Sequence, residues 1–401
     1  MRFDITQPIE LKKGLYKLNK NPDYNYQLGR LVNADGADLD CVKAVAGSIH
    51  DNASRKSVLL REAERFDAVH DIRNAGAFYR MAEFYMEWDD PDALRAWKRA
   101  RELFFDYYAG YFEGSDPVVE QFSIPYDGYS MPCMKLNPCH PAAFSFTSRK
   151  KGVVVMNGGF DSSYEEFFPA MEYLRENGYL VYLFEGPGQG ACMRLSHAPL
   201  TLEWEKPVKA LLDFFALKDV CLIGASLGGY YSPRAAAFEP RISSFVSWPA
   251  FPSLRANVDS QSKLTWPAAK FLILHFHDLI DRSYEKSTRL GKSGGLSDFL
   301  KVYYHRLGCN SILGLLEKFE EMDMAPFGAK ITQDVLLLGG EKDNIIASGI
   351  YREQEADRPN ARSIKVRILT DAEEGSDHCN FGNIKLAMDV VLEWLSEISR
   401  N

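Results

Sequence analysis

One serine of the chain stands in a sequence pattern that is typical of an enzymatic nucleophile. Residues 224–229 read Gly-Ala-Ser-Leu-Gly-Gly, so Ser226 lies in a G-x-S-x-G motif between an apolar run and a helix-like segment. In this motif the serine occupies a sharp turn, and small residues two before and two after it let strand and helix approach. The amide of Leu227 would then lie at a helix N-terminus, where it can bind an oxyanion. The motif predicts acyl-transfer chemistry at Ser226.

A serine hydroxyl becomes nucleophilic when a general base takes its proton, and an acidic side chain must orient that base. Where a sheet carries this serine turn, the acid follows a later strand and the histidine follows the last strand. The apolar run at residues 364–369 leads into a loop ending in Asp377-His378-Cys379, and His378 is the only histidine after position 305. We therefore predict His378 as the general base.

The acid is expected in the loop after the preceding strand-like run. Residues 335–338 are apolar and lead into Gly-Gly-Glu-Lys-Asp-Asn, which places Asp343 where the acid should stand. Glu341, Asp371 and Asp377 are the alternatives. Asp377 is adjacent to His378 in the chain, so its carboxylate is poorly placed to orient the imidazole ring.

A second amide for the oxyanion should come from the loop after an early strand. Residues 153–156 are apolar and are followed by Asn-Gly-Gly-Phe-Asp, in which paired glycines let the backbone approach a substrate. The amide of Phe160 is our first choice of donor and that of Gly159 the second. The alternative is a plain glycine turn. We interpret another glycine-rich turn, at residues 185–190, as structural, because it shapes the sheet edge near the site.

The elements that position these residues follow a regular pattern. After a predicted hairpin at residues 118–136, short apolar runs alternate with helix-like segments, which is typical of a parallel sheet covered on both faces. The predicted strands are 152–156, 179–184, 220–223, 242–246, 335–338 and 364–369, and the predicted helices are 164–176, 202–217, 227–238 and 384–398.

Two further regions are predicted to be helical. Residues 1 to about 115 contain helix-like runs at 78–86 and 90–105, the second of which begins with turn and cap residues. Residues 252–330 interrupt the strand–helix alternation with helical runs at 271–279 and 312–319, so we interpret them as an insertion over the sheet.

Composition excludes several classes of protein. The 401 residues are 46% hydrophobic and 25% charged, as in ordinary globular proteins. With 47 basic and 55 acidic residues, the net charge of −8 argues against nucleic acid as a partner. The chain has no apolar run of transmembrane or signal-peptide length, so we expect a soluble, cytoplasmic protein without a membrane partner. Its seven cysteines are scattered without C-x-x-C spacing, which predicts neither a disulfide framework nor a metal site.

The motifs together resemble the α/β-hydrolase superfamily. The matching stretches are 157–162, 185–190, 224–236 and 377–379, and they resemble the group of 2,6-dihydroxypseudooxynicotine hydrolase, fermentation-respiration switch proteins and fungal pigment enzymes that shorten polyketides. The resemblance implies an α/β-hydrolase fold at residues 118–401, with a mostly parallel, doubly wound sheet and the helical insertion as a cap. Residues 1–117 would be a helical lid domain. Pro233, inside the helix after the serine, resembles a feature of this group, and we interpret it as a kink.

The resemblance also implies the reaction. Ser226 would attack a carbonyl, His378 would carry the proton, Asp343 would hold the imidazole, and the amides of Leu227 and Phe160 would bind the oxyanion. Relatives of this kind cleave C–C bonds next to ketones, or esters and amides, and no cofactor or metal is implied. The alternatives are a serine exopeptidase similar to acylaminoacyl-peptidases and a regulator without catalysis.

The substrate class is predicted from the aromatic content. The chain has 25 Phe, 20 Tyr and 6 Trp, many of them in the helical N-terminus and in the insertion. Most should be core residues, but the remainder favour a small aromatic or polyketide-like substrate. The sequence does not determine the oligomeric state, and a homodimer is one alternative.

Overall fold

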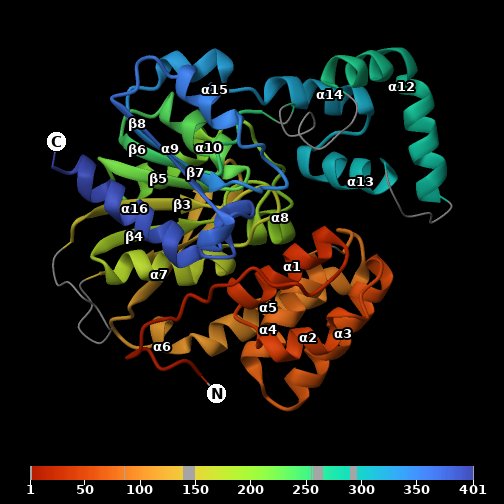
Figure 1. Cartoon of the computed structure of the whole chain (residues 1–401), viewed down its shortest axis with the longest axis horizontal. Coiled ribbons are helices and arrows are strands. Elements are labelled where there is room, and N and C mark those ends of the chain that lie inside the picture. Colours follow the sequence, from red (N-terminus) through yellow and green to blue (C-terminus); the bar gives the residue numbers. More distant parts are fainter. Residues whose placement is uncertain are drawn as a thin grey trace.

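The computed structural model describes residues 2–84, 86–138, 150–253, 255, 265–289 and 296–400. Within these residues the centre of the molecule is an eight-stranded sheet with the order β1-β2-β4-β3-β5-β6-β7-β8 (Figure 1). Strands β1 and β2 form an antiparallel hairpin, β2 pairs with β4 antiparallel, and the remaining neighbours are parallel. The strands are β1 Val119–Tyr126, β2 Tyr129–Leu136, β3 Gly152–Asn157, β4 Tyr179–Phe184, β5 Val220–Ala225, β6 Ile242–Trp248, β7 Asp334–Gly340 and β8 Ser363–Leu369.

Helices cover both faces of the sheet, because its central strands are apolar on both sides. In β3, Val153 and Val155 pack into the core that contains the buried sides of α9 and α10, whereas Val154 and Met156 pack into the core with α7 and α16. This alternation is the consequence of the two-residue repeat of a strand. The covering helices are α7 Phe168–Glu176, α8 Gly190–Ser196, α9 Glu205–Phe214, α10 Gly228–Ala236, α15 Ile350–Ala356 and α16 Ile384–Ile398.

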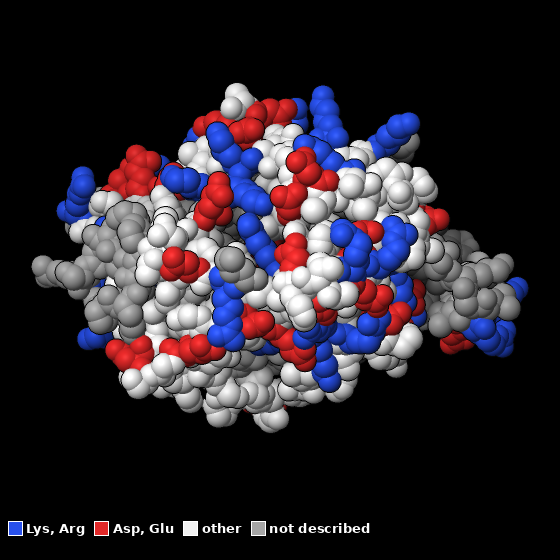
Figure 2. Space-filling view, turned by 90° about the horizontal axis from the view of Figure 1, so that it is seen from below, with Lys and Arg blue, Asp and Glu red and all other residues white. Residues whose placement is uncertain are grey.

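The helical N-terminal segment has its own apolar core and lies below the sheet in Figure 1, in red to orange. Aspartate or asparagine side chains cap four of its helices by accepting hydrogen bonds from the first turn, as the cap-like residues at 90–92 predicted for one of them. The face seen in Figure 2 carries basic and acidic side chains interspersed with one another. The helices are α1 Pro22–Asn33, α2 Leu39–Ala46, α3 Asn52–Ala68, α4 Ile72–Phe84, α5 Pro91–Tyr107 and α6 Ala109–Phe112.

A second group of helices is inserted between β6 and β7. It consists of α12 Trp266–Arg289, α13 Leu296–Leu307 and α14 Ile312–Glu321, followed by the 3-10 turn η2 Ala325–Lys330. In Figure 1 these helices lie to the right of the sheet, with α12 farthest from it. The runs predicted at 271–279 and 312–319 fall within α12 and α14. Residues 254, 256–264 and 290–295 of the predicted insertion lie outside the described residues.

The predicted strands are confirmed to within about two residues, whereas helices α8, α13 and α15 had not been predicted individually. Helix α8 directly follows the glycine-rich turn at 185–190, while α13 and α15 carry mixed patterns without clear start signals. The predicted run at 78–86 belongs to α4, which ends at Phe84, and Tyr85 lies outside the described residues. None of the described helices has the length and apolar character that a bilayer span requires.

Helix α10 continues through Pro233 to Ala236. A proline at this position cannot donate to the carbonyl of Gly229, four residues earlier. That carbonyl instead accepts a hydrogen bond from the hydroxyl of Ser247 on β6, at 3.1 Å. The cost of the interior proline is therefore reduced by a side chain of the neighbouring strand.

Candidate active site

The turn between β5 and α10 has the geometry that the G-x-S-x-G motif predicts. Ser226 has a φ of 56°, in the left-handed region that a residue with a side chain rarely adopts. Strand and helix approach so closely that a Cβ atom on Gly224 would lie 1.9 Å from the carbonyl oxygen of Gly228. The amide of Ser226 donates to the carbonyl of Trp248 on β6, at 2.6 Å, which holds the turn against the sheet.

The structure brings the three predicted side chains together from the ends of three strands. Nε2 of His378 lies 2.9 Å from Oγ of Ser226, and Nδ1 lies 3.0 and 2.9 Å from the two carboxylate oxygens of Asp343. Ser226 follows β5, Asp343 follows β7 and His378 follows β8. These contacts form a continuous hydrogen-bonded chain from carboxylate to hydroxyl, which is the arrangement that activates a serine.

Backbone groups hold both ends of the Asp343–His378 pair. Oδ1 of Asp343 also accepts from the amides of Ile345 and Ile346, at 2.8 and 3.0 Å, so the carboxylate is fixed in one orientation. The hydroxyl of Tyr26 on α1 donates to the backbone carbonyl of His378, at 3.1 Å. The N-terminal helices thus contact the loop that carries the histidine.

The alternatives to Asp343 have other partners. The carboxylate of Asp377 accepts from the amide of Gly382, with both oxygens at 3.0 Å. Glu341 accepts from the amide of Asp371, at 2.8 Å. Burial raises the pKa of Asp377 to about 6. The geometry therefore favours Asp343 as the partner of His378.

The electrostatics of the site favour a charged imidazole. Burial by itself lowers the pKa of His378, but the carboxylate of Asp343 and the neighbouring Cys379 together raise it by more, so the pKa lies well above its usual value. The Asp343 side chain is fully buried and that of His378 is 5% exposed, so water screens their attraction only weakly. Such a pair stabilises the imidazolium that forms when the serine loses its proton.

The loop after β3 lies directly against the serine turn. A Cβ atom on Gly159 would meet Cβ of Ser226 at 2.6 Å and the amide nitrogen of Leu227 at 2.8 Å, so only a glycine allows this approach. The amide of Gly159 donates to Oγ of Ser162, at 2.8 Å, and is thereby occupied. Within the described residues, the amides of Phe160 and Leu227 donate to no other protein group. The geometry favours Phe160 over Gly159 as the second donor.

The glycine-rich turn after β4 supports this loop from behind. The side-chain amide of Gln189 donates to the carbonyls of Gly158 and Gly159, at 2.7 and 2.9 Å. The amide of Gly190 donates to the carbonyl of Ser162, at 3.0 Å. The turn at 185–190 is thus a structural support of the site, in agreement with its interpretation from the sequence.

Substituting Gly159 by alanine is expected to lower the free energy of unfolding by about 1–3 kcal/mol, because the methyl group would collide with the backbone of the serine turn. Urea unfolding followed by circular dichroism would measure the change. Gly349→Ala is a matched control, since a Cβ atom there would have nothing within 4 Å. Equal stability of the two variants would contradict the close packing of the loop against Ser226.

A cavity of about 260 Å³ opens over Ser226 and His378. Its walls come from segments far apart in the sequence, because helices α1 and α4 of the N-terminal segment face the loops at the carboxyl ends of the strands. Aromatic rings and polar side chains both form the wall. Besides Ser226, His378 and the neighbouring Asn344 and Cys379, the lining residues are Asp23, Tyr26, Gln27, Arg30, Phe84, Asp161, Ser162, Glu166, Phe167, Ile345 and Phe381.

Arg30 is the principal cation in this cavity. Its guanidinium lies 4.5 Å from the ring centre of Phe84 and 5.1 Å from that of Phe381, and it pairs with Glu166 through Nη2. The side chain is 7% exposed, and its Nε has no hydrogen-bond partner in the described part of the protein. A buried guanidinium with a free N–H can bind an oxygen atom of a ligand.

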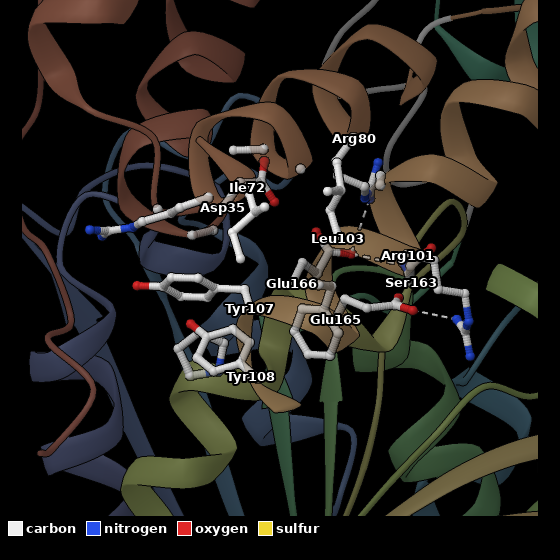
Figure 3. Close-up of a pocket in the computed structure, with 18 of the residues that line it drawn as sticks. Asp35, Ile72, Arg80, Arg101, Leu103, Tyr107, Tyr108, Ser163, Glu165 and Glu166 are labelled. Atoms are coloured by element: carbon white, nitrogen blue, oxygen red, sulfur yellow. Dashed lines mark hydrogen bonds and ion pairs between the residues drawn. The ribbon is translucent and has the colours of Figure 1, made fainter. Parts of the chain in front are cut away.

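Behind Glu166 lies a second, smaller cavity of about 80 Å³, between the N-terminal helices and the start of α7. Figure 3 shows Tyr107 and Tyr108 on one side of it and the pairs of Arg101 with Glu165 and of Arg80 with Glu166 on the other. Burial raises the pKa of Glu165 to about 7. Because Glu166 lines both cavities, this ion-pair cluster holds Arg30 in place from behind.

Among the cavity residues, Glu166 belongs to a sequence pattern that could have identified it. Ser163 and Glu166 form a capping box at the turn before α7, the S-x-x-E pattern that marks a helix start. Arg30, Tyr26 and Phe381 carry no comparable signal, since a lone arginine or aromatic residue in a helical segment is ordinary. Their place in the site depends on how the helices pack.

Comparison with known families agrees with this geometry. The model of a family described as "Alpha/beta hydrolase family" matches residues 153–383, more than half of the chain. The matched part begins at β3 and ends after His378, so it includes all three side chains of the hydrogen-bonded chain.

Two curated fungal proteins are similar in sequence. The chain is 30% identical over 266 residues to the 20-hydroxy-prefusarin hydrolase FUS2 of Gibberella moniliformis, covering 58% of this chain and 62% of the relative. It is 30% identical over 281 residues to the alpha/beta hydrolase psoB of Aspergillus fumigatus, covering 61% of this chain and 62% of the relative. The chain thus matches less than two thirds of the length of these relatives.

Two solved structures share the fold over nearly the whole chain. The crystal structure of 2,6-dihydroxy-pseudo-oxynicotine hydrolase superposes with a TM-score of 0.59 at 21% identity and covers 92% of this chain and 94% of that chain. The structure of AbyA5 superposes with a TM-score of 0.65 at 17% identity and covers 93% and 94%. At these identities the likeness shows the common fold.

Proposed function

Because the chain belongs to the alpha/beta hydrolase family, as its motifs predicted, and is an enzyme of that family, we propose that it hydrolyses a small aromatic or polyketide-like acyl compound. The scissile bond is a C–C bond next to a ketone, or an ester. The observation that carries this proposal is the hydrogen-bonded chain Ser226–His378–Asp343 at the floor of a cavity with aromatic walls.

In the first step Oγ of Ser226 attacks the carbonyl carbon while Nε2 of His378 takes its proton. The carbonyl oxygen becomes an oxyanion, which accepts hydrogen bonds from the amides of Phe160 and Leu227. The imidazolium is stabilised by the Asp343 carboxylate. The low exposure of the pair supports this role, because the attraction is strong where water is excluded.

In the second step the tetrahedral intermediate collapses and the bond to the leaving group breaks. For an ester the leaving group is an alkoxide; for a ketone it is a carbanion that an adjacent carbonyl stabilises as an enolate. In both cases the imidazolium of His378 returns the proton to the leaving group. A water molecule, deprotonated by the same imidazole, then attacks the acyl-serine and releases the acid.

The cavity supports an aromatic substrate rich in oxygen. The rings of Phe84, Phe167 and Phe381 provide apolar walls on which a flat molecule can pack. The guanidinium of Arg30 lines the same cavity, and its positive charge favours a carbonyl or enolate oxygen of the substrate. The fungal relatives are named as hydrolases, which is in line with a hydrolytic reaction.

We propose that residues 1–117 act as a lid domain and that the insertion at about 252–330 acts as a cap. The contribution of α1 and α4 to the cavity wall and the bond from Tyr26 to the histidine loop support the lid role. A serine exopeptidase remains the alternative, and it would need a group for the charged end of a peptide. Asp23, Asp161 and Glu166 line the cavity, and Glu166 is already paired with Arg30.

A labelling and turnover experiment tests the proposal. The protein should react with a fluorophosphonate probe, the Ser226→Ala variant should not, and the protein should turn over p-nitrophenyl esters or aryl β-diketones. Absence of labelling at Ser226 would overturn the proposal. Turnover of aminoacyl-anilides with inert esters and diketones would overturn it in favour of the exopeptidase.

We also propose that the protein is a homodimer that pairs through α12. This helix, whose backbone is kinked at Phe276, packs on the insertion and leaves five large apolar side chains 42–66% exposed, here called the α12 stripe: Phe271, Leu272, Leu274, Phe276 and Leu279. The stripe presents on the order of 400 Å² of apolar surface, about half of the roughly 800 Å² that each partner contributes to a standard interface. A two-fold axis pairs the same surface of both subunits, so two copies can bury these side chains against one another.

The net charge of −8 disfavours an anionic membrane surface as the partner. Sedimentation velocity is expected to show a dimer for the native protein and a monomer for Leu279→Glu. Val69→Glu is the matched control, because Val69 is also 66% exposed but lies at the end of α3, away from the stripe. The proposal would be contradicted if the native protein were monomeric, whether or not it bound anionic vesicles. It would also be contradicted if Leu279→Glu were dimeric.

A further inference from the structure

Helix α13 of the insertion reaches the loop that carries the candidate oxyanion donor. Nη1 of Arg306, near the end of this helix, donates to the carbonyl of Phe160 at 2.7 Å and to that of Gly188 at 3.1 Å. One guanidinium nitrogen therefore bridges the loop after β3 and the glycine-rich turn after β4. Both loops lie at the carboxyl ends of adjacent strands.

The same helix also holds the side chain of Phe160. The ring of Phe160 packs against that of Tyr303 on α13, with ring centres 4.9 Å apart. The guanidinium of Arg306 lies 5.1 Å from the centre of the Phe160 ring. With its carbonyl and its ring both fixed from α13, Phe160 has little freedom to rotate about its backbone bonds.

Arg306 is itself held in a defined place. Its backbone carbonyl accepts from the amide of Leu200, at 3.0 Å, which ties the end of α13 to the segment after α8. Burial lowers the pKa of Arg306, and the nearby carboxylate of Asp161 opposes that effect. A guanidinium partly removed from water in this way depends on the carbonyls that it contacts. The contact with Phe160 is thus part of a built arrangement and not a surface encounter.

We propose that Arg306 is a positioning residue for the oxyanion hole. By fixing the carbonyl of Phe160, it orients the residue whose amide is proposed to donate to the oxyanion, so the docking of the insertion on the core completes the hole. This inference rests on the proposed function, because it assigns no role to Arg306 unless Phe160 donates in the transition state. It connects the cap to the chemical step through one side chain.

Loss of this contact should affect the transition state more than the ground state. A donor that is misoriented by a few tenths of an ångström still lets the substrate bind, but it stabilises the developing charge less well. We expect Arg306→Met to lower kcat by about 10–100-fold, somewhat less than the loss of an oxyanion donor itself, with KM changed by less than about threefold. The kcat of Arg306→Lys should lie between those of the native protein and Arg306→Met, because one ammonium group replaces the planar fork of donors.

The experiment compares kcat, KM and inhibitor affinity in the native protein, Arg306→Lys, Arg306→Met and a control. The control is Lys301→Met, since Lys301 lies on the same helix but pairs with Glu87 and Asp89 of the N-terminal segment. A trifluoromethyl ketone, which forms an oxyanion on Ser226, should bind more weakly to the Arg306 variants in proportion to their loss of kcat. The affinity of the Arg306 variants for an uncharged product-like ketone should stay unchanged. In a separate rescue experiment, guanidinium ion added to Arg306→Gly should restore part of the lost kcat.

The outcomes separate this inference from the proposed function. If the native protein is not labelled by a fluorophosphonate, the proposed function fails. If the native protein is active but the Arg306 variants raise KM with kcat unchanged, or lose affinity for both ketones equally, the positioning role is overturned. If Arg306→Met does not unfold cooperatively, Arg306→Lys provides the same comparison in a folded protein. A native kcat and a native inhibitor affinity in Arg306→Lys would also overturn the positioning role.

Discussion

Replacing Ser226 by alanine is expected to lower kcat by at least about 10³-fold, because the alanine side chain has no atom that can form the acyl intermediate. The neighbouring groups that bind the oxyanion and hold His378 remain in place. The measurement is single-turnover hydrolysis of a p-nitrophenyl ester by the purified variant. Retention of more than about 1% of the native kcat would contradict the nucleophile role.

The same position allows a test of stored backbone strain. Ser226 has a φ of 56°, which costs on the order of 1 kcal/mol for a residue with a Cβ atom. Ser226→Ala keeps that cost, whereas Ser226→Gly relieves it. We expect the glycine variant to be more stable than the alanine variant towards urea, and both to be inactive. This pair of variants separates loss of activity from loss of structure.

Asp343→Asn is expected to lower kcat by about 10³–10⁴-fold while the fold is kept. The amides of Ile345 and Ile346 donate to Oδ1 of Asp343, so the carboxamide oxygen would keep that position. The carboxamide nitrogen would then face Nδ1 of His378, where Oδ2 now lies at 2.9 Å. Two donors cannot face each other, so His378 would carry its proton on Nε2 and could not accept the proton of Ser226.

The pH dependence of kcat/KM provides an independent check of the same pair. Catalysis requires neutral His378, and Asp343 raises the pKa of that histidine well above its usual value of about 6.5. Activity should therefore fall as the pH decreases through a pKa higher than that of a free histidine. Without the carboxylate, burial alone lowers the pKa of His378, so the residual activity of Asp343→Asn should persist to lower pH.

Asp377→Asn is the control for this shift, because Asp377 is also acidic and is half-buried, but its carboxylate accepts from the amide of Gly382. Its acid limb should coincide with that of the native protein. The pairing of His378 with Asp343 would be refuted if Asp377→Asn moved the limb and Asp343→Asn left it in place. The measurement needs only initial rates across a series of buffers at constant ionic strength.

The parts of the site that the sequence alone determines are those with a local physical cause. The serine turn needs small residues at fixed spacing, so Gly224, Ser226 and Gly228 identify it without any knowledge of the sheet. The strands are continuous apolar runs because both faces of a parallel sheet are covered, which also makes them visible in the sequence. Chain order then indicated Asp343 and His378, since acid and base follow later strands in this architecture.

Tertiary structure alone decided which groups complete the site. The amide of Gly159 was a candidate donor by sequence, yet Ser162 accepts from it, and that contact depends on the path of the loop. Arg30 and Arg306 stand in ordinary helical contexts, and only the packing of two helical segments on the sheet brings them to the cavity and to Phe160. The physical reason is that local sequence determines the conformation of a segment, whereas the contacts between distant segments arise from how their surfaces fit.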